Sequence, residues 1–241
     1  MHVYVCSYLE TPTGPNGIHV FDFDPATGAL APLATVSEGI ERASFMAVNK
    51  AGTILALADE RDEGLLQTFR RDPATGGLTH IDSKPTLGAH ACHVSFDIYE
   101  EHLLLANYTG GSFAVIPVDA EGNLGEPDLF RHEGSGPNPD RQEGPHPHMV
   151  APHPIEGTIY VSDLGKDEVE IYDLDPETGR LSADIVEETI VLHPGAGPRH
   201  FVFSSDAGDI WVNGELDSTV SLFHRNEGNG DWDHVQTVST L

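Results

Sequence analysis

The chain has 241 residues, and its 12 Lys and Arg against 39 Asp and Glu give it a formal net charge of −27. Its hydrophobic fraction of 39% is typical of a globular protein rather than a disordered one, and no apolar run is long enough to span a membrane. The acidic charge argues against nucleic acid as a partner, because binding to phosphates requires clustered cations.

The N-terminal residues predict strands rather than a targeting segment. They lack the basic region and the apolar stretch of a signal peptide, so we expect a cytoplasmic location. Strand-like runs occur at residues 2–7, 17–23 and 31–37, and residues with high β-propensity dominate them.

A turn motif then recurs along the chain. DPATGAL at residues 24–30 returns as DPATGGL at 72–78 and as DPETGRL at 175–181, with a degenerate copy, DAEGNL, at 119–124. Residues 226–232 occupy the equivalent place in the last unit. In such a turn Asp caps the backbone with its side chain, Pro fixes φ, and Gly tolerates a positive φ.

Around each turn the same order of four strand-like runs appears, and no long helical period competes with it. Four antiparallel strands that repeat every 47 to 56 residues are typical of a β-propeller, so the predicted fold class is all-β. The predicted units are residues 2–38, 43–87, 91–132, 146–193 and 199–240.

The first unit supplies three strands instead of four, and no strand follows the last unit to complete it. We therefore expect one propeller domain that forms only part of a ring, with four full blades and one incomplete blade. An open arc exposes apolar blade flanks and sheet edges. We expect the chain to be either a fragment or one that self-associates or takes a partner chain to complete the ring.

The longest connection is residues 133–150, EGSGPNPDRQEGPHPHMV, rich in Gly, Pro and ionisable residues. Because the other connections are short, this one predicts a functional loop. Strand direction places this loop on the same face as the other loops that lead into first strands and those that follow second strands. Polar side chains are therefore expected to gather at one mouth of the central channel. The residues expected there are His90, His93, Arg141, His146, His148, Arg199 and His200 before or within first strands, and Asp59, Asn107, Tyr108, Asp163, Asn213, Glu215 and Asp217 after second strands.

These segments resemble a known family. GPHPHMV at 144–150, PGAGPRHFVF at 194–203 and NGELDSTVSLF at 213–223 are similar to the lactonase family of seven-bladed β-propellers. GAHACHVSFD at 88–97 and the run from 103 to 125 resemble it too. The family includes bacterial 6-phosphogluconolactonase and a fungal carboxymuconate-lactonising enzyme. The resemblance covers essentially the whole chain and implies that about two blades are absent from it.

The resemblance implies an active site made by a histidine of the GPH-type motif, the arginine of PRH and the glutamate of NEL. These correspond to His146 or His148, Arg199 and Glu215, although a glycine precedes Glu215 where the family has none. Opening a lactone needs a base near neutral pH and a cation for the oxyanion, which histidine and arginine supply. Glu215 would orient the histidine or protonate the leaving alkoxide. Alternation along an extended segment predicts that His146 and His148 point to one side.

Further side chains at this mouth are predicted to contact substrate, namely His93, Asn107, Tyr108, Arg141, His200 and Asn213. The pairs His90-x-x-His93 and His146-x-His148 lack the surroundings of a recognisable metal site, so neither a metal nor another cofactor is expected. The leading hypothesis is a cofactor-independent lactonase of carbohydrate metabolism that hydrolyses a sugar lactone such as 6-phosphogluconolactone. The alternatives are a muconate-type lactonising enzyme and a non-catalytic propeller scaffold.

The excess of carboxylates also predicts adaptation to high salt, because screening removes the self-repulsion that otherwise loosens an acidic fold. Dialysis from about 2 M KCl, where the Debye length is a few Å, into low salt is expected to unfold the chain. Circular dichroism measures the loss of β-structure, and a fold that keeps the same unfolding temperature in both buffers would contradict this prediction.

Overall fold

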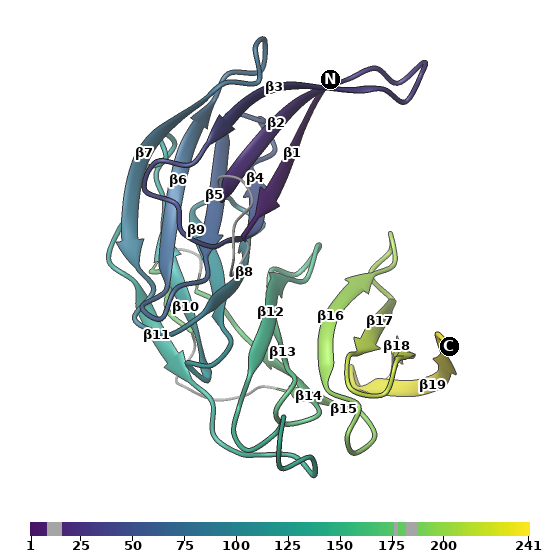
Figure 1. The fold of residues 1–241 in the computed structure, drawn as a ribbon. Coiled ribbons are helices and arrows are strands. Elements are labelled where there is room, and N and C mark those ends of the chain that lie inside the picture. Colours follow the sequence, from purple (N-terminus) through teal and green to yellow (C-terminus); the bar gives the residue numbers. More distant parts are fainter. Residues whose placement is uncertain (9–15, 176–177, 182–187) are drawn as a thin grey trace.

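The structure is a computed structural model and describes residues 1–8, 16–175, 178–181 and 188–241. Within these ranges every regular element is a β-strand, and the strands form five antiparallel sheets, four with four strands and one with three. Figure 1 shows the sheets following one another around an open arc. The all-β propeller predicted from the repeat is therefore confirmed, with four full blades and one incomplete blade. Within the same ranges, no helix is long and apolar enough to cross a bilayer.

The strands run in sequence order across each sheet. The first sheet contains β1 (His2–Ser7), β2 (Gly17–Phe23) and β3 (Leu30–Val36). The second contains β4 (Ala43–Val48), β5 (Ile54–Asp59), β6 (Leu65–Arg71) and β7 (Leu78–Pro85), and the third contains β8 (Ala91–Phe96), β9 (His102–Asn107), β10 (Ser112–Pro117) and β11 (Asp128–Arg131). The fourth contains β12 (Pro147–Pro152), β13 (Ile159–Asp163), β14 (Glu168–Tyr172) and β15 (Glu188–Val191), and the fifth contains β16 (Pro198–Phe203), β17 (Asp209–Gly214), β18 (Thr219–Arg225) and β19 (Trp232–Ser239).

The repeated turns have the predicted construction. Asp72 accepts hydrogen bonds from the Ala74 N–H at 2.8 Å and the Thr75 hydroxyl at 2.7 Å, and Gly76 closes the turn at a φ of 75°. The turn that begins at Asp24 has the same three features. In the third copy residues 176–177 lie outside the described residues, as do residues 182–187 at the start of the predicted fourth strand there.

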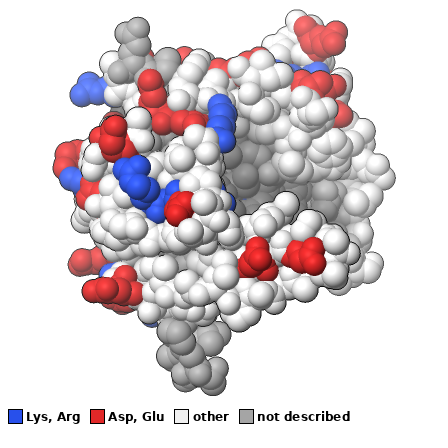
Figure 2. Space-filling view, turned by 90° about the horizontal axis from the view of Figure 1, so that it is seen from above, with Lys and Arg blue, Asp and Glu red and all other residues white. Residues whose placement is uncertain are grey.

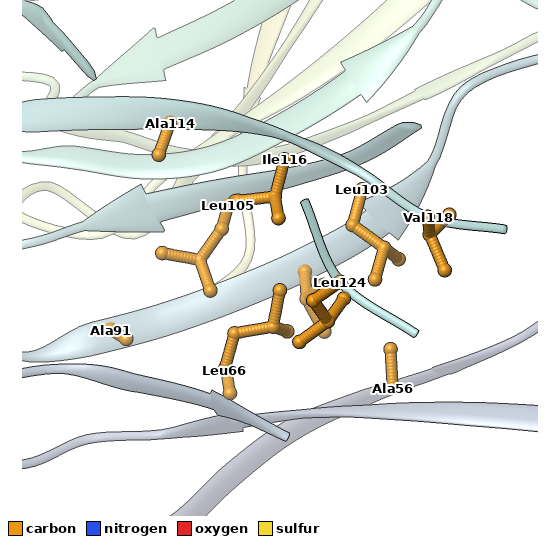
Figure 3. Packing of buried hydrophobic residues seen from close by; sticks show 11 residues of the cluster. Ala56, Leu66, Ala91, Leu103, Leu105, Ala114, Ile116, Val118 and Leu124 are labelled. Carbon is orange, nitrogen blue, oxygen red and sulfur yellow. The ribbon is translucent and has the colours of Figure 1, made fainter. Parts of the chain in front are cut away.

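The core lies between successive sheets. Leu103 and Leu105 of β9 face the second sheet, where they pack with Leu66 of β6 (Figure 3), and Leu104 faces the fourth sheet. All four side chains are shielded from solvent. A strand covered on both faces needs apolar residues at consecutive positions, which explains the run Leu103-Leu104-Leu105-Ala106.

The two end sheets have a neighbouring sheet on one face only. Val202 of β16 is 61% exposed and forms a cross-strand row with Trp211 and Leu222, and Val5 of β1 is 43% exposed. In the interior sheets the second strands β5, β9 and β13 are buried at every position. These rows are the apolar flanks that an open arc was expected to expose.

We predict that Leu105→Ala destabilises the fold by about 2–5 kcal/mol, because it removes a fully buried side chain and leaves a cavity. Leu33→Ala is the matched control, since Leu33 of β3 is 50% exposed, and it should change stability by less than about 0.5 kcal/mol. Urea unfolding of the two variants measures the difference. Equal losses would contradict the packing described for β9.

Candidate active site

The inner strands of the four complete blades share one irregularity. In β4, β8, β12 and β16 the pairing with the next strand shifts register between Ala43 and Phe45, Ala91 and His93, Pro147 and Met149, and Pro198 and Phe201. Such a β-bulge leaves residues without a cross-strand partner and re-aims their side chains. The residues within these shifts are Ser44, Cys92, His148, Arg199 and His200.

A second set of equivalent positions lies directly after the second strand of a unit. Tyr8, Glu60, Tyr108 and Glu215 occupy this position in four units, and the buried Leu164 occupies it in the remaining one. The two sets meet at one cavity of about 570 Å³. It is lined by Tyr8, Ser44, Phe45, Glu60, Cys92, Tyr108, Arg141, His148, Arg199, His200 and Glu215.

Glu215 connects the charged groups of this cavity. Arg141 Nη2 donates to Glu215 Oε1 at 2.6 Å, Arg199 Nε donates to Oε2 at 2.9 Å, and His148 Nε2 lies 3.8 Å from Oε2. Arg141 also donates to the Tyr108 hydroxyl at 3.2 Å, so the long loop reaches across two blades. Burial alone would raise the pKa of the Glu215 carboxyl, but the hydrogen bond from Arg141 and the neighbouring positive charges lower it overall. Glu215 is therefore ionised at neutral pH.

His148 is held in its neutral form. Its side chain is 10% exposed, and burial, followed by the positive charge of Arg199, lowers its pKa to about 4. The same two causes lower the pKa of the neighbouring His200 to about 4. A neutral imidazole has a free acceptor nitrogen, so His148 can take a proton from a bound water at pH 7.

His146 lies beside the cavity. Its ring stacks on Tyr108 at a centroid distance of 4.7 Å, and its Nδ1 and Nε2 lie 3.1 Å from the Tyr108 carbonyl oxygen and from Glu143 Oε1. It does not line the cavity. Both rings contact Tyr108, whereas only His148 lies within the register shift of β12 and lines the cavity. That both histidines point to one side stays a prediction.

The other predicted residues divide between the cavity and its supports. Tyr108, Arg141 and His200 line it, whereas His93, Asn107 and Asn213 do not. Asn107 is buried and accepts the Thr86 hydroxyl hydrogen bond at 2.7 Å, and Asn213 Oδ1 accepts the His200 N–H at 2.8 Å within the β16 bulge.

His93 also belongs to the support. It is buried, and its ring packs on Phe45 at a centroid distance of 4.3 Å and on His200 at 5.5 Å. Burial lowers its pKa well below the ordinary value, with a further contribution from His200. A neutral His93 therefore supports the cavity residues Phe45 and His200 by packing and adds no charge to the site.

The glycine before Glu215 does not move that carboxylate away from the site. Gly214 pairs with Pro198 in the fifth sheet, and the buried Asp59 pairs with the equivalent Ala43 in the second sheet. Gly214 therefore occupies the position that a buried carboxylate has in the second blade. A Cβ there would lie 2.5 Å from Asp217 Oδ1, so the Asp217 side chain needs this space. Glu215 therefore keeps the position after the strand.

Sequence reasoning missed five cavity residues, namely Tyr8, Ser44, Phe45, Glu60 and Cys92. The signal was present in the repeat, because aligning the units at their second strands places Tyr8 and Glu60 beside Tyr108 and Glu215. Among the described residues, no group of three or more His, Cys, Asp and Glu side chains is arranged to hold a metal ion. Figure 2 shows acidic and basic groups interspersed around a hollow on the face seen from above.

Comparisons with known proteins agree with this geometry. A family model described as "Lactonase, 7-bladed beta-propeller" matches residues 2–241. The chain is 32% identical over 240 residues to a 6-phosphogluconolactonase of Bacillus subtilis, covering 99% of this chain and 66% of that protein. The chain thus spans slightly less than two thirds of the length of this relative.

Solved structures of related proteins also superpose on this chain. A putative 6-phosphogluconolactonase from Bacteroides fragilis superposes with a TM-score of 0.89 at 27% identity, over 99% of this chain and 67% of that one. A periplasmic gluconolactonase from Pseudomonas aeruginosa superposes with a TM-score of 0.89 at 30% identity, over 99% of this chain and 68% of that one. The match extends from the first sheet to the last.

The histidines provide a test of the site's electrostatics. As pH falls, His148 should remain neutral through the ordinary histidine range and protonate only near pH 4. His224 is the internal control, because its hydrogen bond to Asp209 raises its pKa above the ordinary value. NMR titration of the imidazole C–H signals, assigned with His148→Gln and His224→Gln, measures both. A His148 midpoint at or above that of His224 would contradict the buried, Arg199-flanked environment.

Proposed function

Because the chain belongs to the family of seven-bladed β-propeller lactonases, we propose that it hydrolyses a sugar lactone such as 6-phosphogluconolactone, without a cofactor. The observation that supports this most is the meeting of neutral His148 with Arg199, Arg141 and Glu215 in one cavity. A base and fixed cations are what lactone opening requires. The names of the relatives supply the substrate class.

In the proposed reaction His148 accepts a proton from water, and the resulting hydroxide attacks the lactone carbonyl carbon. The negative charge that develops on the carbonyl oxygen is stabilised by Arg199. The ring C–O bond then breaks, and the leaving alkoxide receives the proton from the His148 imidazolium. The products are an alcohol and a carboxylic acid, and the acid releases its proton to solvent to become a carboxylate. This assigns the acid step to His148 rather than to Glu215, because a carboxyl with a lowered pKa is ionised and has no proton to give.

Glu215 has two other roles in this proposal. Its two oxygens hold Arg141 and Arg199 in place, which orients the donor groups before the substrate binds. Its charge also stabilises the imidazolium that forms on His148, 3.8 Å away. Two arginines with one glutamate leave one net positive charge, which suits a substrate with one phosphate or carboxylate group.

Two expectations stay predictions. One is a cytoplasmic place in carbohydrate metabolism. The other is association with a second copy or a partner chain that completes the ring, which size-exclusion chromatography with light scattering would detect.

The proposal is tested by hydrolysis of 6-phosphogluconolactone, gluconolactone and muconolactone, followed by acid release in a pH-stat. His148→Gln should lower kcat by about 10²–10⁴-fold, because it removes the base, and Arg199→Ala by about 10²–10³-fold, because it removes oxyanion stabilisation. The matched controls are His224→Gln and Arg70→Ala, which alter a histidine and an arginine outside the cavity and should keep full activity.

Two outcomes would overturn the proposal. One is a wild-type chain that gives no rate above spontaneous hydrolysis with any of the three lactones. The other is an Arg199→Ala or His148→Gln variant that is as active as its control. Faster turnover of muconolactone than of the sugar lactones would favour the muconate-type alternative.

A further inference from the structure

The side of the cavity formed by the second blade carries a different set of groups. Glu60 Oε2 accepts hydrogen bonds from the Ser44 hydroxyl at 2.6 Å and from the Tyr8 hydroxyl at 3.2 Å. Ser44 comes from the bulge of β4, and Tyr8 follows β1. All three side chains line the same cavity as Arg199 and Glu215.

Glu60 and Glu215 occupy equivalent places in their blades but have opposite partners. Two arginines hold Glu215, whereas two hydroxyl groups bond to Glu60. Cys92 lies between these two ends of the cavity. Burial raises the pKa of its thiol, the charge of Glu60 raises it further, and the charge of Arg199 opposes them. The cavity therefore has a cationic end and an end of hydroxyls with one carboxylate.

The second end has the chemistry of a polyol site. A carboxylate accepts hydrogen bonds from adjacent hydroxyl groups, and the serine and tyrosine hydroxyls both donate and accept. An apolar chain would displace water from these three groups and offer no hydrogen bond in its place.

We propose that Glu60, together with Ser44 and Tyr8, binds the hydroxyl groups of the substrate and so selects polyhydroxylated lactones over apolar lactones. This inference rests on the proposed function for the orientation of the ligand, with its carboxyl carbon at Arg199 and its hydroxyl groups toward Glu60. Nothing in the reaction itself requires Glu60, so its role is in specificity.

The test uses binding, so that it does not depend on turnover. The wild-type chain is titrated by calorimetry with D-gluconate, the hydrolysed form of a sugar lactone, and with hexanoate, which has the same carbon chain without hydroxyl groups. Gluconate should bind at least about tenfold more tightly, because hydrogen bonds to a charged group contribute at that level.

Glu60→Gln should weaken gluconate binding by about tenfold and leave hexanoate binding unchanged, because it removes the charge and keeps the shape. Glu63→Gln, which alters an exposed carboxylate on the same loop, is the control and should change neither. Arg199→Ala should weaken gluconate and hexanoate alike.

The inference is overturned if Glu60→Gln binds gluconate as the wild type does, if it weakens hexanoate equally, or if the wild-type chain does not prefer gluconate. A chain that shows the expected binding pattern but hydrolyses no lactone would refute the proposed function and leave this inference standing. A chain that hydrolyses sugar and apolar lactones equally well, with or without Glu60, would refute this inference and leave the proposed function standing.

Discussion

The β-bulge at the start of each inner strand is the constraint on which the candidate site depends. A regular antiparallel strand sends alternate side chains into the two neighbouring blades, and none of them toward the centre of the ring. The register shifts in β4, β8, β12 and β16 release one or two residues per blade from this alternation. Because the core-facing residues resume their pattern one step later, as Val94 and Val150 do, the shift leaves the packing between blades intact.

Arrangement of charge within the cavity matters more than the charge of the whole protein. The chain carries a net −27, yet Arg141 and Arg199 converge on one carboxylate and leave a local positive excess. In the same cavity burial, and after it the charge of Arg199, lowers the pKa of His148 and keeps it neutral. One arrangement thus supplies an anion site and an uncharged base together. Removal of Arg199 would therefore alter the basicity of His148 as well as the binding of the oxyanion.

The fold could be predicted because its signals are local and repeated. The turns at Asp24 and Asp72 depend on residues within five positions of each other, and the strand run around Leu104 depends on burial of both faces. The site could be predicted only in part. Family motifs identified Arg199 and Glu215, but the choice between His146 and His148 depends on a bulge that no hydrophobic pattern reveals. Asn107 is polar at the right end of its strand, yet it is buried in hydrogen bonds with Thr86 and Ser112.

The repeat also explains how one fold can hold an asymmetric site. Each complete blade has two equivalent backbone positions at this end, one in the bulge and one after the second strand. Ser44, Glu60, Arg199 and Glu215 contribute little to the core, so such positions can differ from blade to blade without loss of packing. Ser44 with Glu60, Cys92 with Tyr108, and Arg199 with Glu215 are three versions of one pair. The difference between the hydroxyl-bonded Glu60 and the arginine-bonded Glu215 then gives the ligand a direction, because only one end of the cavity accepts its anionic group.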